Sequence, residues 1–365
     1  MAPRVRLHPR PAFHAVLALG LGCSIDPREG DGVVLPPGDG PYTCDEKSGK
    51  PEDLFEEVWT ILDETYPYIE YKGIDWSALH DECLVEVCDP DHEYEDFATS
   101  GMNCLLAPLS DWLVFVIDRD GEYLRYGIEY AQSNVNPSLA DGYLDDGTLT
   151  LENTTTAGRL EDGRFGYLRV EAFESSSLDD DVEELVAGIG PVEGYVVDLR
   201  ENVVGNSEQI AMDVAGQFVT DTATPYGFDQ YREEIDGDPA THELGPPIAK
   251  SIESDRVADS PFAGPVAVLT GEVCWTSCEW FLAMMKLAPD VRSFGAATQG
   301  NSSEAQLLTL EADSETFLVS STSLASLGDG TVIEWNGIAP DELVEFSDDG
   351  DDEVLEAAIA WLQDR

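Results

Sequence analysis

Apolar residues recur at helical spacing near the start of the chain. Within residues 51–65 they return every three or four positions, which predicts an amphipathic helix. The same spacing over residues 76–87 predicts a second helix. We therefore expect residues 51–107 to form a small helical domain.

The pattern changes twice further along. Residues 108–163 contain short β-rich runs separated by Asp-Gly and Gly pairs, which predicts a connecting segment of antiparallel strands. From residue 164, buried-strand runs alternate with helical stretches, as is typical of βα units around a largely parallel sheet. The predicted strands are 165–170, 194–199 and 265–269, and the predicted helices are 178–189, 208–218 and 277–287. Residues 164–345 are thus expected to form an α/β core, and residues 346–365 a closing segment with a helix over 352–362.

Composition limits the possible partners. Hydrophobic residues make up 42% of the 365 positions, enough for a substantial core, but 74 acidic against 19 basic residues give a net charge of −55. Such a surface repels phosphate backbones and anionic lipid head groups, which argues against nucleic-acid binding and against adsorption on a membrane. The acidic run from Asp348 to Glu353 is expected to be solvated surface; the alternative is cation binding, although it lacks the regular ligand spacing of a calcium loop.

The N-terminus has the order of a secretory signal. Residues 1–22 contain three arginines, no acidic residue and a short apolar run that ends directly before Cys23. A cysteine in that place resembles a bacterial lipoprotein signal, in which the cysteine is acylated. We expect an exported chain at the cell envelope, lipid-anchored through Cys23 or otherwise secreted, with residues 23–50 as anchor and flexible tether.

Six further cysteines suggest disulfides in an exported protein, with pairings that the sequence leaves open. They are Cys44, Cys83, Cys88, Cys104, Cys274 and Cys278. The close pair Cys274 and Cys278 is expected to be structural, either as a disulfide or as small apolar groups. A zinc site is not expected, because the chain has few histidines and no second close pair at zinc-site spacing.

Two turns could carry chemistry. The strand ending at Asp198 and Arg200 leads through Asn202, Val204 and Gly205 into a helix, and backbone amides in such a turn can hold an oxyanion. The alternative is an ordinary turn in which the Asp-Arg pair satisfies buried charges.

The second turn places Thr276 and Ser277 at a helix start. A hydroxyl there gains from the helix dipole and is a credible nucleophile, but it is equally suited to capping the helix.

Seven motifs in one order resemble the tail-specific, or C-terminal processing, serine peptidases. These are Phe55-x-x-Val58-Trp59, Lys72-Gly73-Ile74-Asp75-Trp76, Gly166-Tyr167-Leu168-Arg169-Val170, Asp198-Leu199-Arg200-x-Asn202, Thr276-Ser277-Cys278-Glu279, Gly295-x-x-Thr298-x-Gly300 and Gly337-Ile338-x-Pro340-Asp341. The chain is more similar to the tricorn-core-like branch, since no glycine-rich stretch announces a PDZ domain. The resemblance implies a ClpP/crotonase-like α/β core behind a helical cap, and cleavage of extended polypeptides by acyl transfer without metal or cofactor.

The family's catalytic positions carry over with changes. Its serine lies three residues before a glutamate, so Glu279 assigns Thr276 to the nucleophile position, with Ser277 one place later. Its lysine base, where present, falls at Asn301. Other base candidates are His242, Lys250 and Glu304, among which the sequence gives no choice.

Two further positions of the resemblance also differ. The histidine that some branches use falls at Leu113, and the first glycine of the oxyanion loop is replaced by Val204, while Gly205 keeps the second. These departures leave two hypotheses open: a hydroxyl-nucleophile endopeptidase, or a catalytically degenerate relative that binds peptides or a partner at the cell surface. A crotonase-type acyl-CoA enzyme is disfavoured, because CoA phosphates require lysines and arginines that this surface lacks.

Overall fold

The computed structural model of the chain describes residues 50–88, 101–118, 120–125, 127, 131–145, 149–151, 155–173, 176–203, 207–235, 238–347 and 350–365. All of them belong to one compact unit that extends from Pro41 to Arg365. The expected signal, Cys23 and the tether lie outside the described residues. Within the described part, no helix is both long and apolar enough to cross a membrane.

The predicted N-terminal helices are present. Helix α1 (Lys50–Thr65) buries Phe55, Val58 and Leu62 against α2 (Trp76–Val87), which begins at the N-cap Asp75. A disulfide between Cys83 and Cys104 joins α2 to the helical stretch at residues 101–106, which continues into the 3-10 turn η1 (Ala107–Leu109).

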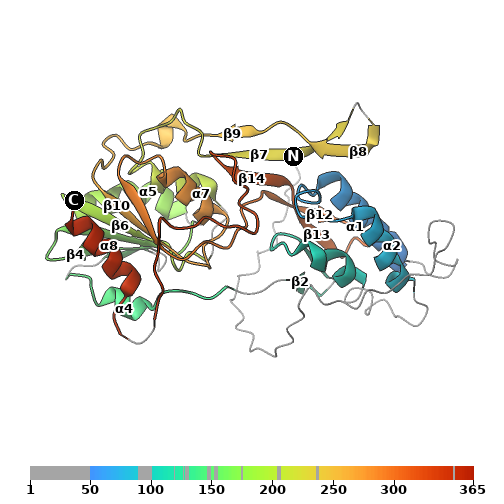
Figure 1. Ribbon diagram of the computed structural model, residues 1–365, viewed down its shortest axis with the longest axis horizontal. Helices are drawn as coiled ribbons and strands as arrows, with labels where there is room; N and C mark the ends of the chain where they lie inside the picture. Colours follow the sequence, from blue (N-terminus) through green and yellow to red (C-terminus); the bar gives the residue numbers. More distant parts are fainter. Residues whose placement is uncertain are drawn as a thin grey trace, which may run out of the picture. The chain divides into compact units, whose positions relative to one another are not determined.

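Strands from distant parts of the sequence complete this helical region. They form an antiparallel sheet in the order β12-β13-β1-β2, and its residues Val116 and Leu318 share a hydrophobic cluster with α1 and α2 (Figure 1). The bounds are β1 (Phe115–Ile117), β2 (Tyr123–Arg125), β12 (Ala305–Thr309) and β13 (Phe317–Ser321). Strands β1 and β2 lie in the connecting segment where antiparallel strands were predicted. Strand β13, which pairs with β1, and β12, which pairs with β13, come from the far end of the chain.

The core sheet has seven strands in the order β15-β11-β10-β6-β5-β4-β3. Its bounds are β3 (Leu149–Leu151), β4 (Thr155–Leu160), β5 (Phe165–Val170), β6 (Gly194–Asp198), β10 (Val266–Thr270), β11 (Val291–Gly295) and β15 (Glu342–Leu343). Strands β5, β6, β10, β11 and β15 run parallel, whereas β4 and β3 add antiparallel pairs at one edge. The α/β prediction is therefore confirmed.

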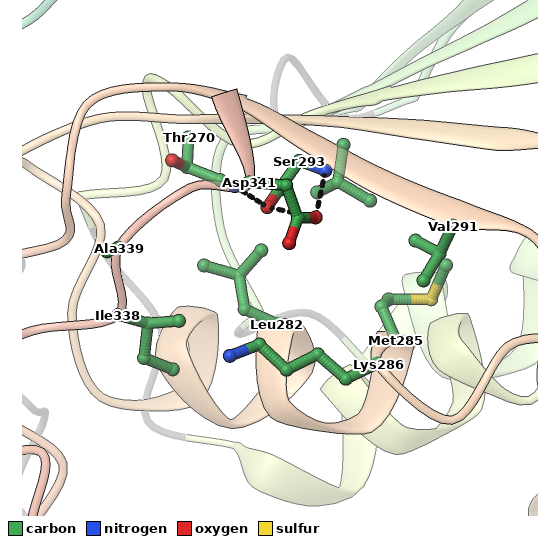
Figure 2. A pocket seen from close by; sticks show the side chains of 10 residues that line it. Thr270, Leu282, Met285, Lys286, Val291, Ser293, Ile338, Ala339 and Asp341 are labelled. Atoms are coloured by element: carbon green, nitrogen blue, oxygen red, sulfur yellow. Dashed lines mark hydrogen bonds between the residues drawn. The ribbon is translucent and has the colours of Figure 1, made fainter. Parts of the chain in front are cut away.

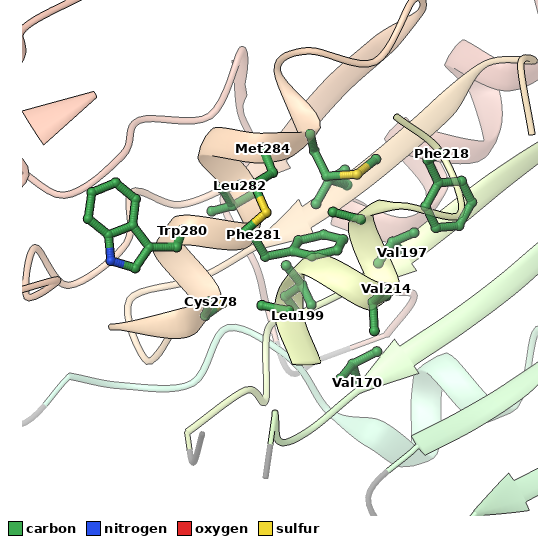
Figure 3. Packing of buried hydrophobic residues seen from close by; sticks show 14 of the residues in the cluster. Val170, Val197, Leu199, Val214, Phe218, Cys278, Trp280, Phe281, Leu282 and Met284 are labelled. Atoms are coloured by element: carbon green, nitrogen blue, oxygen red, sulfur yellow. The ribbon is translucent and has the colours of Figure 1, made fainter. Parts of the chain in front are cut away.

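Helices cover both faces of this sheet. On one face, α5 (Ser176–Ile189), α6 (Glu208–Ala215) and α7 (Ser277–Met285) pack their apolar residues onto the strands. Phe281 of α7 lies among Val197, Leu199 and Val214 in this layer (Figure 3). On the other face, α8 (Glu353–Gln363) and α4 (Pro137–Asp141) share a cluster with the strands. Helix α8 is the predicted closing helix, whereas α4 lies within the connecting segment and was not predicted.

A further antiparallel sheet was also missed. It consists of β7 (Gly227–Ile235), β8 (Asp238–Leu244) and β9 (Ile248–Lys250), with β14 (Ser323–Leu327) paired to β7 and a 3-10 turn η2 (Ser254–Arg256) following. Strand β7 becomes largely polar and partly exposed in its second half, so it has no continuous apolar face that a pattern search would detect.

Candidate active site

The two turns singled out in the sequence leave the core sheet at the same edge. Strands β6 and β10 are parallel neighbours, and Asp198 at the end of β6 pairs with Leu269 near the end of β10. The carboxyl ends of parallel strands, with the helices that follow them, are where α/β folds place ligands. The fold thus brings together the two segments that the sequence assigned to an oxyanion loop and a nucleophile.

Thr276 immediately precedes helix α7 and has an unusual backbone. Its φ is 50° and its ψ is −115°, values of the first central residue in a type II′ turn, where glycine predominates. A β-branched residue is costly in this conformation, and such strain is found preferentially at functional sites. The Thr276 side chain makes no capping hydrogen bond to α7, so the capping role considered for it is not what the structure shows.

Ser277, the other nucleophile candidate, is the first residue of α7 and is only 4% exposed. Thr276, one position earlier, is partly exposed. Of the two residues, Thr276 is therefore the more exposed, and it is the one that counting back from Glu279 placed first.

The Glu279 carboxylate fixes the neighbouring loop. It is fully buried and accepts four hydrogen bonds, which come from the Thr298 hydroxyl (2.5 Å), the Gly300 amide (2.7 Å), the Asn301 amide (2.9 Å) and the Ser302 hydroxyl (2.6 Å). Burial raises the pKa of Glu279, although the four donors oppose that shift. Glu279 therefore has a structural role, which is to hold residues 298–302 against the start of α7.

Asn301 lies beside the nucleophile position through its backbone. Its carbonyl oxygen accepts a hydrogen bond from the Thr276 amide at 2.9 Å. Its side chain is buried, yet neither amide atom is hydrogen-bonded to any residue that the structure describes. A neutral amide does not take up a proton near neutral pH, so Asn301 cannot replace a lysine as general base.

Asp198 and Arg200 have a structural role of the kind considered as the alternative. The buried Arg200 guanidinium contacts both carboxylate oxygens of Asp198 and, at 2.7 and 2.8 Å, both oxygens of Asp352 at the N-cap of α8. Burial alone would raise the pKa of Asp198, but Arg200 and the Tyr167 hydroxyl outweigh it and hold that pKa below its ordinary value. Asp352 belongs to the acidic run, so this member of the run is paired to an arginine inside the protein and is not part of a solvated or cation-binding surface.

The turn after β6 reaches the start of α7. Asn202 is buried and donates its side-chain amide to the Val170 carbonyl oxygen at 2.9 Å. The Trp275 indole then donates to the Val203 carbonyl oxygen at 3.0 Å, one residue before Thr276. The oxyanion-loop candidates Val204 and Gly205 follow directly but lie outside the described residues.

A third segment, residues 109–113, also lies at this place. The Trp112 ring contacts the Trp275 ring with centroids 6.1 Å apart. Its position is fixed by buried groups: Lys72 donates to the Leu109 carbonyl oxygen at 2.5 Å, and Asp111 accepts the Leu113 amide at 2.8 Å. Leu113 occupies the position where the resemblance placed a histidine. The contact between the two tryptophans was not predicted, and their places next to motif positions were the only indication of it in the sequence.

Cys274 and Cys278 form a disulfide across the start of α7, with their Cα atoms 5.5 Å apart. This settles the structural alternatives in favour of the disulfide, and sulfurs bonded to each other do not serve as thiolate ligands of zinc. Cys88 is also disulfide-bonded.

Lys250, another base candidate, is paired with two carboxylates. Lys250 lies 2.8 Å from both Glu208 and Asp229, and although burial opposes its charge, these carboxylates raise its pKa. A lysine whose pKa is raised remains protonated and is a poor base. His242 lies on β8, opposite Glu234 of β7, and Glu304 follows the loop held by Glu279 and is exposed.

A small pocket behind α7 is unsuited to substrate. Figure 2 shows Leu282 and Met285 of α7 facing Ser293 and Asp341 across it. Its volume of about 20 Å³ suffices for roughly one water molecule. The pocket is therefore too small to hold a polypeptide segment.

Two family descriptions match the sequence. Residues 164–344 match peptidase family S41, and residues 49–97 match the Tricorn protease C1 domain. No curated protein matches the chain.

Solved structures share the fold. A candidate peptidase from Parabacteroides merdae is similar with a TM-score of 0.72 and 23% identity, over 86% of this chain and 96% of that one. A lipoprotein from Streptococcus agalactiae has a TM-score of 0.56 at 13% identity, over 89% and 99%. Mature CPAF has a TM-score of 0.57 at 10% identity, over 86% and 96%. Identities this low establish similarity of fold alone.

Proposed function

The chain belongs to peptidase family S41, and from that premise we propose that it is a hydroxyl-nucleophile endopeptidase that cleaves extended polypeptide segments. The observation that carries this proposal is the conformation of Thr276. It projects from a strained turn between strand β10 and helix α7, as the nucleophile does in other hydrolases with a strand–turn–helix elbow. This conformation costs free energy at a threonine, and residues held in such conformations cluster at functional sites.

In the proposed reaction, the Thr276 Oγ1 atom attacks the scissile carbonyl carbon. A C–O bond forms and the C–N bond breaks, while the threonine proton passes through a base to the leaving amine. Water then hydrolyses the acyl ester and restores the hydroxyl. The N-terminus of α7 and amides around Val204 and Gly205 would stabilise the oxyanion.

A second function is favoured by a specific observation. Asn301 occupies the family's base position and Lys250 is held in two ion pairs, so neither residue can accept the proton of Thr276. A chain without a base would still bind peptides at the same surface without cleaving them. Peptide binding by a degenerate family member is therefore the alternative.

A labelled unstructured protein incubated with the purified chain tests both functions. Thr276→Ala is expected to lower kcat by at least ~10³-fold, the scale on which a lost nucleophile acts. The variant should remain fully folded, since Thr276 makes no capping bond to α7. Ser277→Ala is the matched control and should retain most activity, because that hydroxyl is buried.

The outcomes separate the two functions. Full activity in Thr276→Ala with loss in Ser277→Ala would show that the assignment is shifted by one residue. Binding of the labelled protein with no cleavage by the parent chain would instead establish the binding-only alternative.

We also propose that the chain is exported and lipid-anchored. The support is the arginine-bearing apolar run that ends before Cys23, together with the three disulfide-bonded cysteine sites of the described part, which suit an oxidising compartment. The polypeptide it acts on is accordingly expected to be extracytoplasmic.

A further inference from the structure

The Cys274–Cys278 disulfide closes a ring of five residues, and Thr276 is the middle one. The two cysteines are fully buried and belong to the hydrophobic cluster beneath α6 and α7, where Cys278 lies near Trp280 and Phe281 (Figure 3). Both ends of the ring are therefore anchored in the core, while Thr276 between them is partly exposed.

Thr276 has the conformation least suited to its residue type within this ring. A φ of 50° with a ψ of −115° favours glycine, and threonine adopts it only when its surroundings enforce it. One enforcing contact is the hydrogen bond from the Thr276 amide to the Asn301 carbonyl oxygen. On the other side, the Thr276 carbonyl oxygen accepts hydrogen bonds from the Glu279 and Trp280 amides in the first turn of α7.

The disulfide adds a covalent restraint to these hydrogen bonds. By fixing the separation between the residues two before and two after Thr276, it excludes the extended conformations of this segment. We propose that the Cys274–Cys278 disulfide is a positioning element that holds the Thr276 hydroxyl outward at the start of α7. The catalytic consequence rests on the proposed function, whereas the conformational claim does not.

A thermodynamic cycle tests the claim without measuring activity. Thr276→Gly removes the strain at no steric cost, so it should raise the melting temperature of the parent by about 1–6 °C. In a Cys274→Ala/Cys278→Ala background the segment is already relaxed, and the same change should lower the melting temperature by about 1–4 °C, the entropic effect of glycine. The matched control is a Cys83→Ala/Cys104→Ala background, in which Thr276→Gly should act as in the parent.

If Thr276→Gly shifts the melting temperature equally in all three backgrounds, the proposal is overturned, because the loop at residues 298–302 would then be sufficient to hold Thr276. Amide exchange gives a second readout if the cysteine variant does not fold. The Glu279 and Trp280 amides donate to the Thr276 carbonyl oxygen. A dithiol reduces the disulfide to two thiols and is itself oxidised. After this treatment the two amides should exchange at least ~10-fold faster. Unchanged protection of both amides would also overturn the proposal.

Activity measurements then separate this proposal from the proposed function. In an active chain, loss of the disulfide should lower kcat and leave KM nearly unchanged, since the nucleophile moves and the binding surface does not. If the parent chain cleaves nothing, the proposed peptidase function fails, but the cycle of melting temperatures still decides whether the disulfide holds Thr276.

Discussion

Replacing Glu279 by glutamine tests how the loop beside the nucleophile position is held. Each carboxylate oxygen of Glu279 accepts one backbone amide and one hydroxyl, Gly300 with Thr298 and Asn301 with Ser302. In Glu279→Gln an NH₂ group replaces one of these oxygens. The facing hydroxyl can turn and accept from it, but the facing backbone amide cannot and loses its acceptor.

The expected loss of stability follows from these contacts. A buried amide without an acceptor costs roughly 1–3 kcal/mol, and each of the two bonds retained by the other oxygen loses about 1 kcal/mol when the acceptor is no longer charged. Burial opposes the charge of Glu279, as its raised pKa indicates, so removing that charge offsets part of the lost stability. The net destabilisation should be about 2–4 kcal/mol.

Urea unfolding measures this difference, with Glu315→Gln at an exposed position as the matched control. The control should change the free energy of unfolding by less than about 0.5 kcal/mol. Amide exchange should also accelerate at Gly300 or Asn301, the residue that loses its acceptor. A Glu279→Gln variant as stable as the control, with both amides still protected, would refute the assignment of Glu279 as the residue that holds this loop.

Three further predictions concern other parts of the chain. The pKa of Asp198 is lowered in the folded state, so Asp198 stabilises the protein above its unfolded-state pKa, and this contribution is lost as pH falls through the folded value. The free energy of unfolding of Asp198→Asn should therefore be much lower than that of the parent at pH 7. Urea unfolding at a series of pH values should show this difference in free energy becoming smaller toward pH 2. Trp112→Ala removes the ring beside Trp275, so it should raise KM roughly 2- to 10-fold for substrates with large apolar side chains and less for alanine-rich substrates. Equal changes in KM for the two kinds of substrate would exclude an aromatic contact to substrate. Cys23→Ser should move the exported protein from the detergent phase to the aqueous phase on partition, and equal partition of variant and parent would exclude the lipid anchor.

Local patterns in the sequence predicted the elements that carry a complete signal of their own. Helix α1 and strand β5 bury their apolar positions as the periodicity indicated. The assignment of Thr276 to the nucleophile position, which counts back from Glu279 along the family pattern, stays a prediction. Strands β7, β8 and β9 were not predicted, because strands with partly exposed polar residues lack the alternation on which such predictions depend.

The sequence by itself determined the α/β class and the family, because both depend on patterns of residues close together in the chain, and it supplied Thr276 as the nucleophile candidate. Only the tertiary structure decided which of its groups act together. It pairs Arg200 with Asp352 across 152 positions, brings the Trp112 ring into contact with the Trp275 ring, and pairs Lys250 with two carboxylates. These contacts join segments whose separation in sequence carries no periodic signal, and they form because burying a charge or an aromatic ring requires a partner that the fold alone brings within reach.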